Sequence, residues 1–90
     1  MNYTDFIRRT QFVKDDELEV VLTTGDVDYS GTALEVTCDN IELFHFVVDE
    51  DGVQQVVVFP QKSCYRMNLS TLDAIILAAK EEVRSTNDSK

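Results

Sequence analysis

The chain of 90 residues contains no Trp, one Pro, three Gly and two Cys. Two cysteines are too few for a disulfide framework, and the spacing between Cys38 and Cys64 matches no zinc-binding pattern. We therefore expect two reduced, partly buried thiols, as in a cytoplasmic protein.

Long apolar runs are missing as well. The longest, residues 44–48 and 56–59, fall far short of the ~20 residues that a membrane-spanning helix needs. The first residues, MNYTDFIRRTQ, lack the basic head and apolar run of a signal peptide. The sequence therefore predicts no membrane segment and no membrane partner.

Basic residues are absent from the middle of the chain, because no Lys or Arg lies between Lys14 and Lys62. That stretch is rich in Asp and Glu, and the formal net charge is -9. A strongly acidic domain does not attract a polyanion over long range. Two interpretations stay open: an acidic surface that only keeps the protein dissolved, or a dipolar molecule whose basic ends face a ligand. The basic residues near those ends include Arg8, Arg9, Lys62 and Arg66.

Apolar content is high enough for a folded core. With 43% hydrophobic residues the chain is too apolar to be disordered. Its length predicts a single domain, which we place at residues 1–84, followed by a polar tail at 85–90.

Alternating apolar residues separated by short turns predict an antiparallel meander. The expected strands cover residues 17–23, 27–38, 41–48, 53–59 and 64–69. Gly25 suits the first turn, Gly31 a bend of the kind that curls a sheet into a barrel, and Asp39-Asn40 a tight hairpin. Short helices are expected at residues 3–13, with Thr4 as N-cap, and at 70–83, with Ser70 as N-cap.

The third and fourth strands read apolar on both faces. In a small antiparallel sheet one face normally meets water and is polar. Residues 41–48 and 53–59 therefore need a second cover, either a helix or another subunit. For so small a core we favour a subunit.

Three segments together resemble the Sm-like (LSm/Hfq-type) family: LEVVLTTG at 18–25, GTAL at 31–34 and DNIEL at 39–43. The resemblance implies a mainly β fold, a small five-stranded, strongly bent antiparallel barrel with a short N-terminal helix and an added C-terminal helix. It also implies a homo-oligomeric ring of about five to seven subunits. Such a ring would bind single-stranded nucleic acid, RNA by preference, in a processing or chaperone role.

Carried over by position, the nucleic-acid-binding residues are Asp39, Asn40, Gln61 and Lys62. Asn40 would read a base edge and Lys62 would meet a phosphate. The alternative is that Asn40 only forms the turn and Lys62 is a solvated lysine. The acidic charge also supports a second hypothesis, an acidic protein–protein interaction module, adaptor or inhibitor, that binds no nucleic acid.

Catalysis is not expected, and neither is a cofactor or a metal. His45 is the only histidine and lies in the most apolar strand, which is typical of a packed or interface residue. A pairing of His45 with Cys38 or Cys64 stays open, although no third, orienting group is suggested. The acidic run 49–51 is more typical of a solvated hairpin tip than of a cation site.

Overall fold

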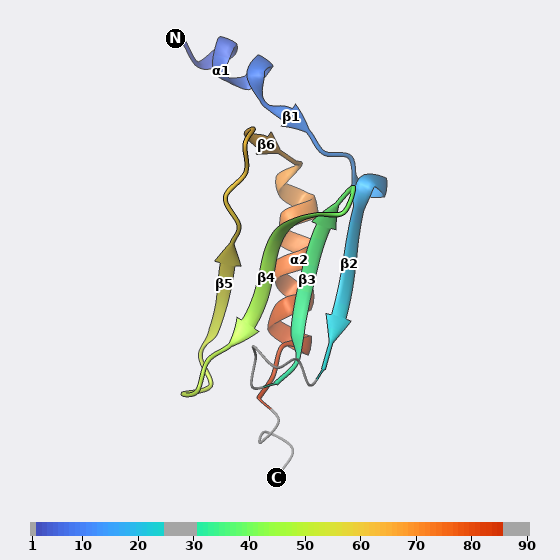
Figure 1. The fold of residues 1–90 in the computed structure, drawn as a ribbon, viewed down its shortest axis with the longest axis vertical. Helices are drawn as coiled ribbons and strands as arrows, with labels where there is room; N and C mark the ends of the chain where they lie inside the picture. Colours follow the sequence, from blue (N-terminus) through green and yellow to red (C-terminus); the bar gives the residue numbers. More distant parts are fainter. Residues whose placement is uncertain (1, 25–30, 86–90) are drawn as a thin grey trace.

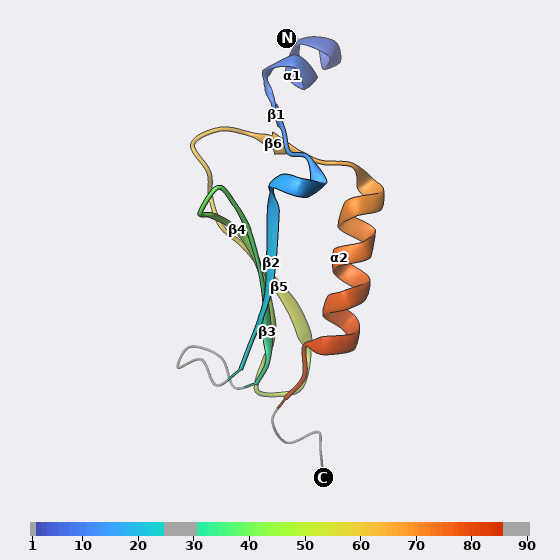
Figure 2. The same cartoon turned by 90° about the vertical axis from the view of Figure 1, so that its right-hand side faces the viewer.

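A four-stranded antiparallel sheet with one long helix on one of its faces forms the body of the protein (Figures 1 and 2). The computed structural model describes residues 2–24 and 31–85. The helices and strands, in chain order, are α1 (Tyr3–Arg9), β1 (Gln11–Phe12), the 3-10 helix η1 (Asp15–Glu17), β2 (Leu18–Thr23), β3 (Ala33–Cys38), β4 (Ile41–Val48), β5 (Gln54–Val58), β6 (Tyr65–Arg66) and α2 (Leu69–Glu82). The predicted turn at Gly25 and the tail beyond residue 85 lie outside the described residues.

The sheet has the order β2-β3-β4-β5, so each strand pairs with its neighbour along the chain, as a meander requires. Asp39 and Asn40 have φ of 50° and 66°, and they connect β3 to β4 in two residues. A two-residue hairpin of this type needs positive φ at both positions, which Asn and Asp tolerate. The predicted tight turn at these residues is confirmed.

The main core lies between the sheet and α2. Alternate residues of β3 and β4 point to the helix, which contributes Ile75 and Ala79. The buried members of this cluster are Leu34, Val36, Phe46, Val48, Ile75, Ala79 and Val83. We call the face of the sheet that carries these residues the inner face, and the opposite one the outer face. The chain's own helix thus covers one of the two apolar faces of 41–48, and a subunit as the cover of the other face stays a prediction.

A smaller core cluster of Val13, Cys38 and Leu43 closes one end of the sheet. It is held by β1 and β6, which pair in parallel although they are far apart in the sequence. The Gln11 N–H donates to the Cys64 carbonyl at 2.9 Å and the Val13 N–H to the Arg66 carbonyl at 2.8 Å. Beyond this pair, α1 has no buried residue and projects away from the body (Figure 1).

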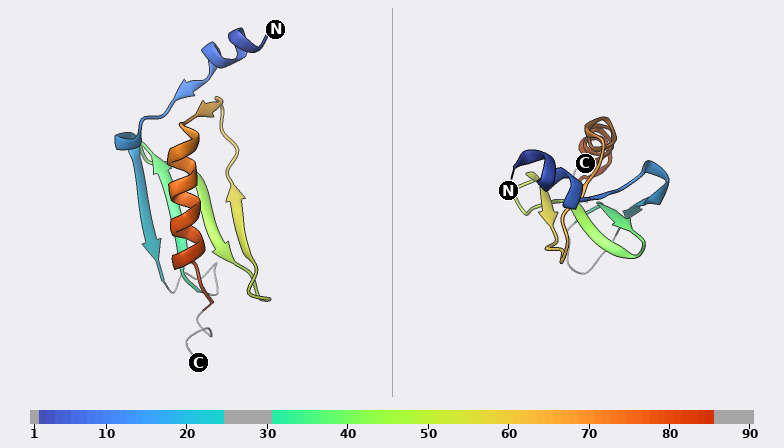
Figure 3. Two further views of the ribbon diagram at one scale, coloured as in Figure 1. Left: turned by 180° about the vertical axis from the view of Figure 1, so that it is seen from behind. Right: turned by 90° about the horizontal axis from the view of Figure 1, so that it is seen from above.

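The described residues form an open sheet and not the predicted five-stranded barrel (Figure 3). The expected fifth strand, 64–69, shortens to Tyr65–Arg66, because α2 already begins at Leu69. This short strand pairs with β1 and leaves β5 as an edge of the sheet. The coarser prediction, a small and mainly β fold with a helix near each end of the domain, is confirmed.

Both helices differ from the prediction in their limits. The first ends at Arg9 and not at residue 13, and its N-cap is Asn2, whose side chain accepts a hydrogen bond from the Asp5 N–H at 2.9 Å. The second begins one residue before Ser70, with Asn68 in the N-cap position. Neither described helix is long and apolar enough to cross a membrane.

Candidate functional site

The four residues predicted to bind nucleic acid lie in two turns that meet at one end of the sheet. The Gln61 Nε2 donates to the Glu42 carbonyl at 2.6 Å and to the Phe59 carbonyl at 3.2 Å. These bonds tie the segment after β5 to the start of β4, next to the Asp39-Asn40 turn. Asp39, Asn40 and Lys62 are exposed, whereas the Gln61 amide is already engaged in holding its own loop.

Other basic side chains near this end are engaged elsewhere or lie apart. The Arg66 guanidinium lies 4.9 Å from the centre of the Phe12 ring, a cation–π contact that fixes β6 against β1. Arg8 and Arg9 belong to the last turn of the projecting α1, where their positive charges interact favourably with the negative end of the helix dipole. Lys62 follows Gln61, whose amide bonds the Glu42 carbonyl near the Asn40 turn. Lys14 lies near the same end, because its N–H bonds Glu17, whose carboxylate is close to Asp39.

Strand β5 is the most exposed strand of the sheet. Its residues are exposed along the whole length, and Val56 and Val58 expose 50% and 65% of their surface. Among the described residues no strand pairs with its outer edge. The Phe59 N–H bonds to β4, and Asp49 bonds back to the Val53 carbonyl. The main-chain N–H and C=O groups of the odd-numbered residues of β5 therefore point toward β4. Those of the even-numbered residues, such as Val56, point outward from the free edge.

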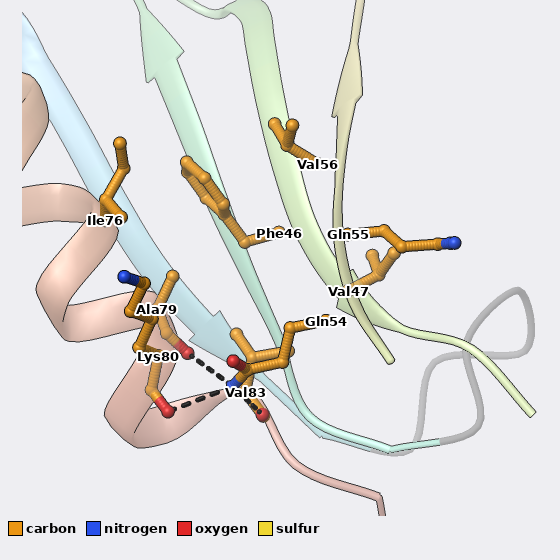
Figure 4. Close-up of a pocket in the computed structure, with 9 residues that line it drawn as sticks. All are labelled: Phe46, Val47, Gln54, Gln55, Val56, Ile76, Ala79, Lys80 and Val83. Atoms are coloured by element: carbon orange, nitrogen blue, oxygen red, sulfur yellow. Dashed lines mark hydrogen bonds between the residues drawn. The ribbon is translucent and has the colours of Figure 1, made fainter. Parts of the chain in front are cut away.

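A groove of about 260 Å³ separates β5 from α2 (Figure 4). Its residues come from β4, β5 and the second half of the helix: Phe46, Val47, Gln54, Gln55, Val56, Ile76, Ala79, Lys80 and Val83. At its lower end in Figure 4 the Gln54 Nε2 donates to the carbonyl oxygens of Lys80 and Val83, each at 2.9 Å. The strand is thus hydrogen-bonded to the helix at the Gln54 end, and farther along the groove Val56 stays exposed.

A second hollow of about 370 Å³ continues along the inner side of β5. Val58 and Phe59 line it from the strand, and Leu72 from the first half of α2. The helix therefore covers β3 and β4 but leaves the inner face of β5 uncovered. The apolar pattern of 53–59 predicted a cover for this segment, either a helix or another subunit, and α2 does not cover the exposed residues of β5.

Three ligand-type side chains meet on the outer face of the sheet, a site that the sequence analysis missed. Glu35 on β3 lies directly opposite His45 on β4. The His45 Nε2 lies 3.2 Å from the Glu42 Oε1, and the ring of His45 packs edge-on against Phe59 with 4.6 Å between ring centres. His45 is buried, as expected for a packed histidine, yet its ring nitrogen faces carboxylates.

Cys38 does not join this site. It lies in the smaller core cluster on the other side of the sheet, so it forms no Cys–His pair with His45. Burial, and then the charges of Asp39 and Glu17, raise the pKa of the Cys38 thiol above 9.0. A thiol that stays protonated is a poor nucleophile. Cys64 is exposed on the segment before β6.

No protein-family model, curated protein or solved structure matches the chain. The site must therefore be interpreted from its own chemistry. An uncharged, exposed edge strand can pair with another strand, and an imidazole beside two carboxylates can bind a metal cation.

Proposed function

We propose that the protein is an acidic interaction module without catalytic activity that assembles by pairing β5 with β5 of a second copy. The observation that carries this proposal is the contrast between the two edges of the sheet. β2 carries Glu19 and follows the acidic η1, and charges of this kind protect an edge from pairing. β5 has no charged residue, no bulge and no proline before Pro60.

The free edge of β5 is complementary to itself. In an antiparallel pair centred on Val56, Val56 lies opposite its own copy, and Gln54 lies opposite Val58 of the second copy. Each of these residue pairs exchanges two main-chain hydrogen bonds. A two-fold axis through this edge would continue the sheet from four strands to eight, which is an isologous and closed assembly.

Electrostatics favours the same surface. Two copies of a chain with a net charge of -9 repel each other, and the repulsion is smallest where neither copy carries an acid. No charged residue lies between Asp51 and Lys62. On the inner face, Val56 would pack beside Val56 of the second copy and Val58 beside Gln54, which removes part of their exposed apolar surface from water.

Light scattering on the intact chain tests this assembly. We expect a mass of about twice 10.2 kDa at about 100 µM protein. Val58→Lys places a charge on the pairing strand and should give the single-chain mass, while Leu22→Lys, a matched change at an exposed inner-face residue of β2, should leave the assembly intact. A wild-type chain that stays single would refute the proposal, and a mass of about five to seven chains would favour the ring instead.

Single-stranded RNA at the Asn40 turn, in an Sm-like ring, is the second candidate function. The Gln61–Glu42 hydrogen bond favours it, because it brings together the two turns that the family resemblance assigns to RNA. Filter binding with short U-rich and A-rich RNAs is the test. Asn40→Ala and Lys62→Ala should each weaken binding, and Lys80→Ala on α2 should not. Absence of binding at low salt would reject this candidate.

The two free cysteines, Cys38 and Cys64, are consistent with a reducing compartment, so we place this function in the cytoplasm.

A further inference from the structure

We propose that Glu35, Glu42 and His45 form a Zn²⁺-binding site on the outer face of β3 and β4. This site is independent of the β5 edge, and either proposal can fail without the other. The three residues come from two neighbouring strands near the centre of the sheet, so rigid elements position all of them (Figure 1).

A β-bulge in β4 creates the cluster. The pairing passes from Val36 opposite Phe44 to Thr37 opposite Glu42, so Leu43 is an additional residue in β4. Without it, side chains would alternate strictly, and Glu42 would point to the opposite face from His45. The bulge places Leu43 in the core and turns Glu42 to the outer face beside His45. Bulges are frequent beside functional sites because they redirect side chains in this way.

The distances suit a small cation. The candidate ligand atoms of Glu35, Glu42 and His45 all lie within 4.8 Å of one another. Zinc binds imidazole nitrogen and carboxylate oxygen at about 2.0–2.2 Å, which puts neighbouring ligand atoms of a tetrahedral site roughly 3.3 Å apart. The distance between the His45 Nε2 and the Glu42 Oε1 is 3.2 Å, close to this ligand-to-ligand separation.

Charge gives a separate reason for a cation here. The two carboxylates of the site lie in a stretch, residues 15–61, that contains no Lys or Arg. Val21 of β2 pairs with Glu35 and Val57 of β5 pairs with His45, so neither neighbouring strand places a cation beside these two residues. A nearby positive charge stabilises two carboxylates that lie close together, because it offsets their mutual repulsion. A metal ion would provide it, and an imidazole ligand favours zinc over Mg²⁺ or Ca²⁺, which prefer oxygen ligands alone.

The other ligand-type cluster of the described residues, Glu17 with Cys38 and Asp39, is less suited to zinc. Zinc binds the thiolate form of cysteine, and the pKa of the buried Cys38 is raised. The two clusters share no residue, so variants can separate them.

Calorimetric titration of the tag-free chain with Zn²⁺ tests the site. We expect one Zn²⁺ per chain and no comparable binding of Mg²⁺. Glu35→Gln, Glu42→Gln and His45→Gln should each weaken zinc binding by at least about 10-fold. Glu42 is half exposed, so Glu42→Gln keeps the test valid if the buried His45 variant does not fold, and circular dichroism checks each fold.

Matched controls come from the acidic hairpin and from the cysteines. Zinc affinity should be unchanged in the double variant Asp49→Asn, Asp51→Asn and in Cys38→Ser and Cys64→Ser. Loss of binding in any of these controls, or full binding by Glu42→Gln, would overturn the assignment. So would a wild-type chain that binds no zinc. Binding should also raise the wild-type melting temperature by several degrees, with no such rise in Glu42→Gln.

Discussion

Gly31 and Arg84 lie so close together that a Cβ atom at Gly31 would stand 2.1 Å from the Arg84 carbonyl oxygen. Gly31 forms a β-bridge with Ser85, and the next residue, Thr32, donates its N–H to the Arg84 carbonyl at 2.9 Å. The chain entering β3 is thus joined main chain to main chain with the segment that leaves α2. Only glycine permits this approach.

Gly31→Ala should therefore lower the free energy of unfolding by about 2–4 kcal/mol, because the backbones must separate to admit a methyl group. Urea unfolding followed by circular dichroism measures this loss. Gly52→Ala is the control, since Gly52 has a φ of 83° but no atom within 4 Å of the added Cβ, so only about 1–2 kcal/mol of backbone strain is expected. Equal losses at both positions would show that the Arg84 contact is unimportant.

Gln54→Ala should lower the free energy of unfolding by about 1–3 kcal/mol. The Gln54 amide bonds carbonyl groups at the C-terminal end of α2, which have no further partner within the helix. Gln55→Ala, which changes the neighbouring side chain on the outer face, should cost less than about 0.5 kcal/mol. Thermal unfolding of the two variants side by side gives the comparison, and a smaller effect at Gln54 than at Gln55 would contradict the capping role.

Cys38 and Cys64 should differ in reactivity and in their effect on stability. Burial raises the pKa of Cys38 in the folded state, so below pH 9 its thiolate is scarce, and a thiol reagent should label Cys64 much faster. A raised folded-state pKa stabilises the protein fully below the unfolded-state pKa. That contribution is lost as pH rises from about 9.0 through the folded-state value. Cys38→Ser should reduce this loss of stability at high pH, and equal labelling of both cysteines would contradict the assignment.

The sheet strands, the Asp39-Asn40 turn and the presence of two helices follow from the sequence, because alternation and turn chemistry are local. The open sheet does not. Tyr65–Arg66 reads as a strand, but whether it pairs with β5 or with the distant β1 depends on contacts far apart in the chain. The helix that follows occupies the face that a barrel would have closed.

One cluster within a single hairpin could not be predicted from the sequence either, because it too depends on packing: Glu35, Glu42 and His45. A regular two-residue turn that pairs Cys38 with Ile41 would place Glu35 opposite Phe44. The additional residue Leu43 shifts the register by one and brings His45 to that position instead. The sequence carries no local signal for this bulge, which follows from the fit of Leu43 into the core beside Val13 and Cys38.

Because α2 follows all four strands of the sheet in the chain, the ribosome finishes the sheet before it makes the helix that covers the sheet. At roughly 5–20 residues per second, the nascent sheet waits about a second or more with its inner face and both edges bare. The uncharged β5 is then the segment of the sheet most open to misassembly with a neighbouring chain. The acidic residues that flank the strands would keep such chains apart during synthesis, which gives the high negative charge a use before the protein has finished folding.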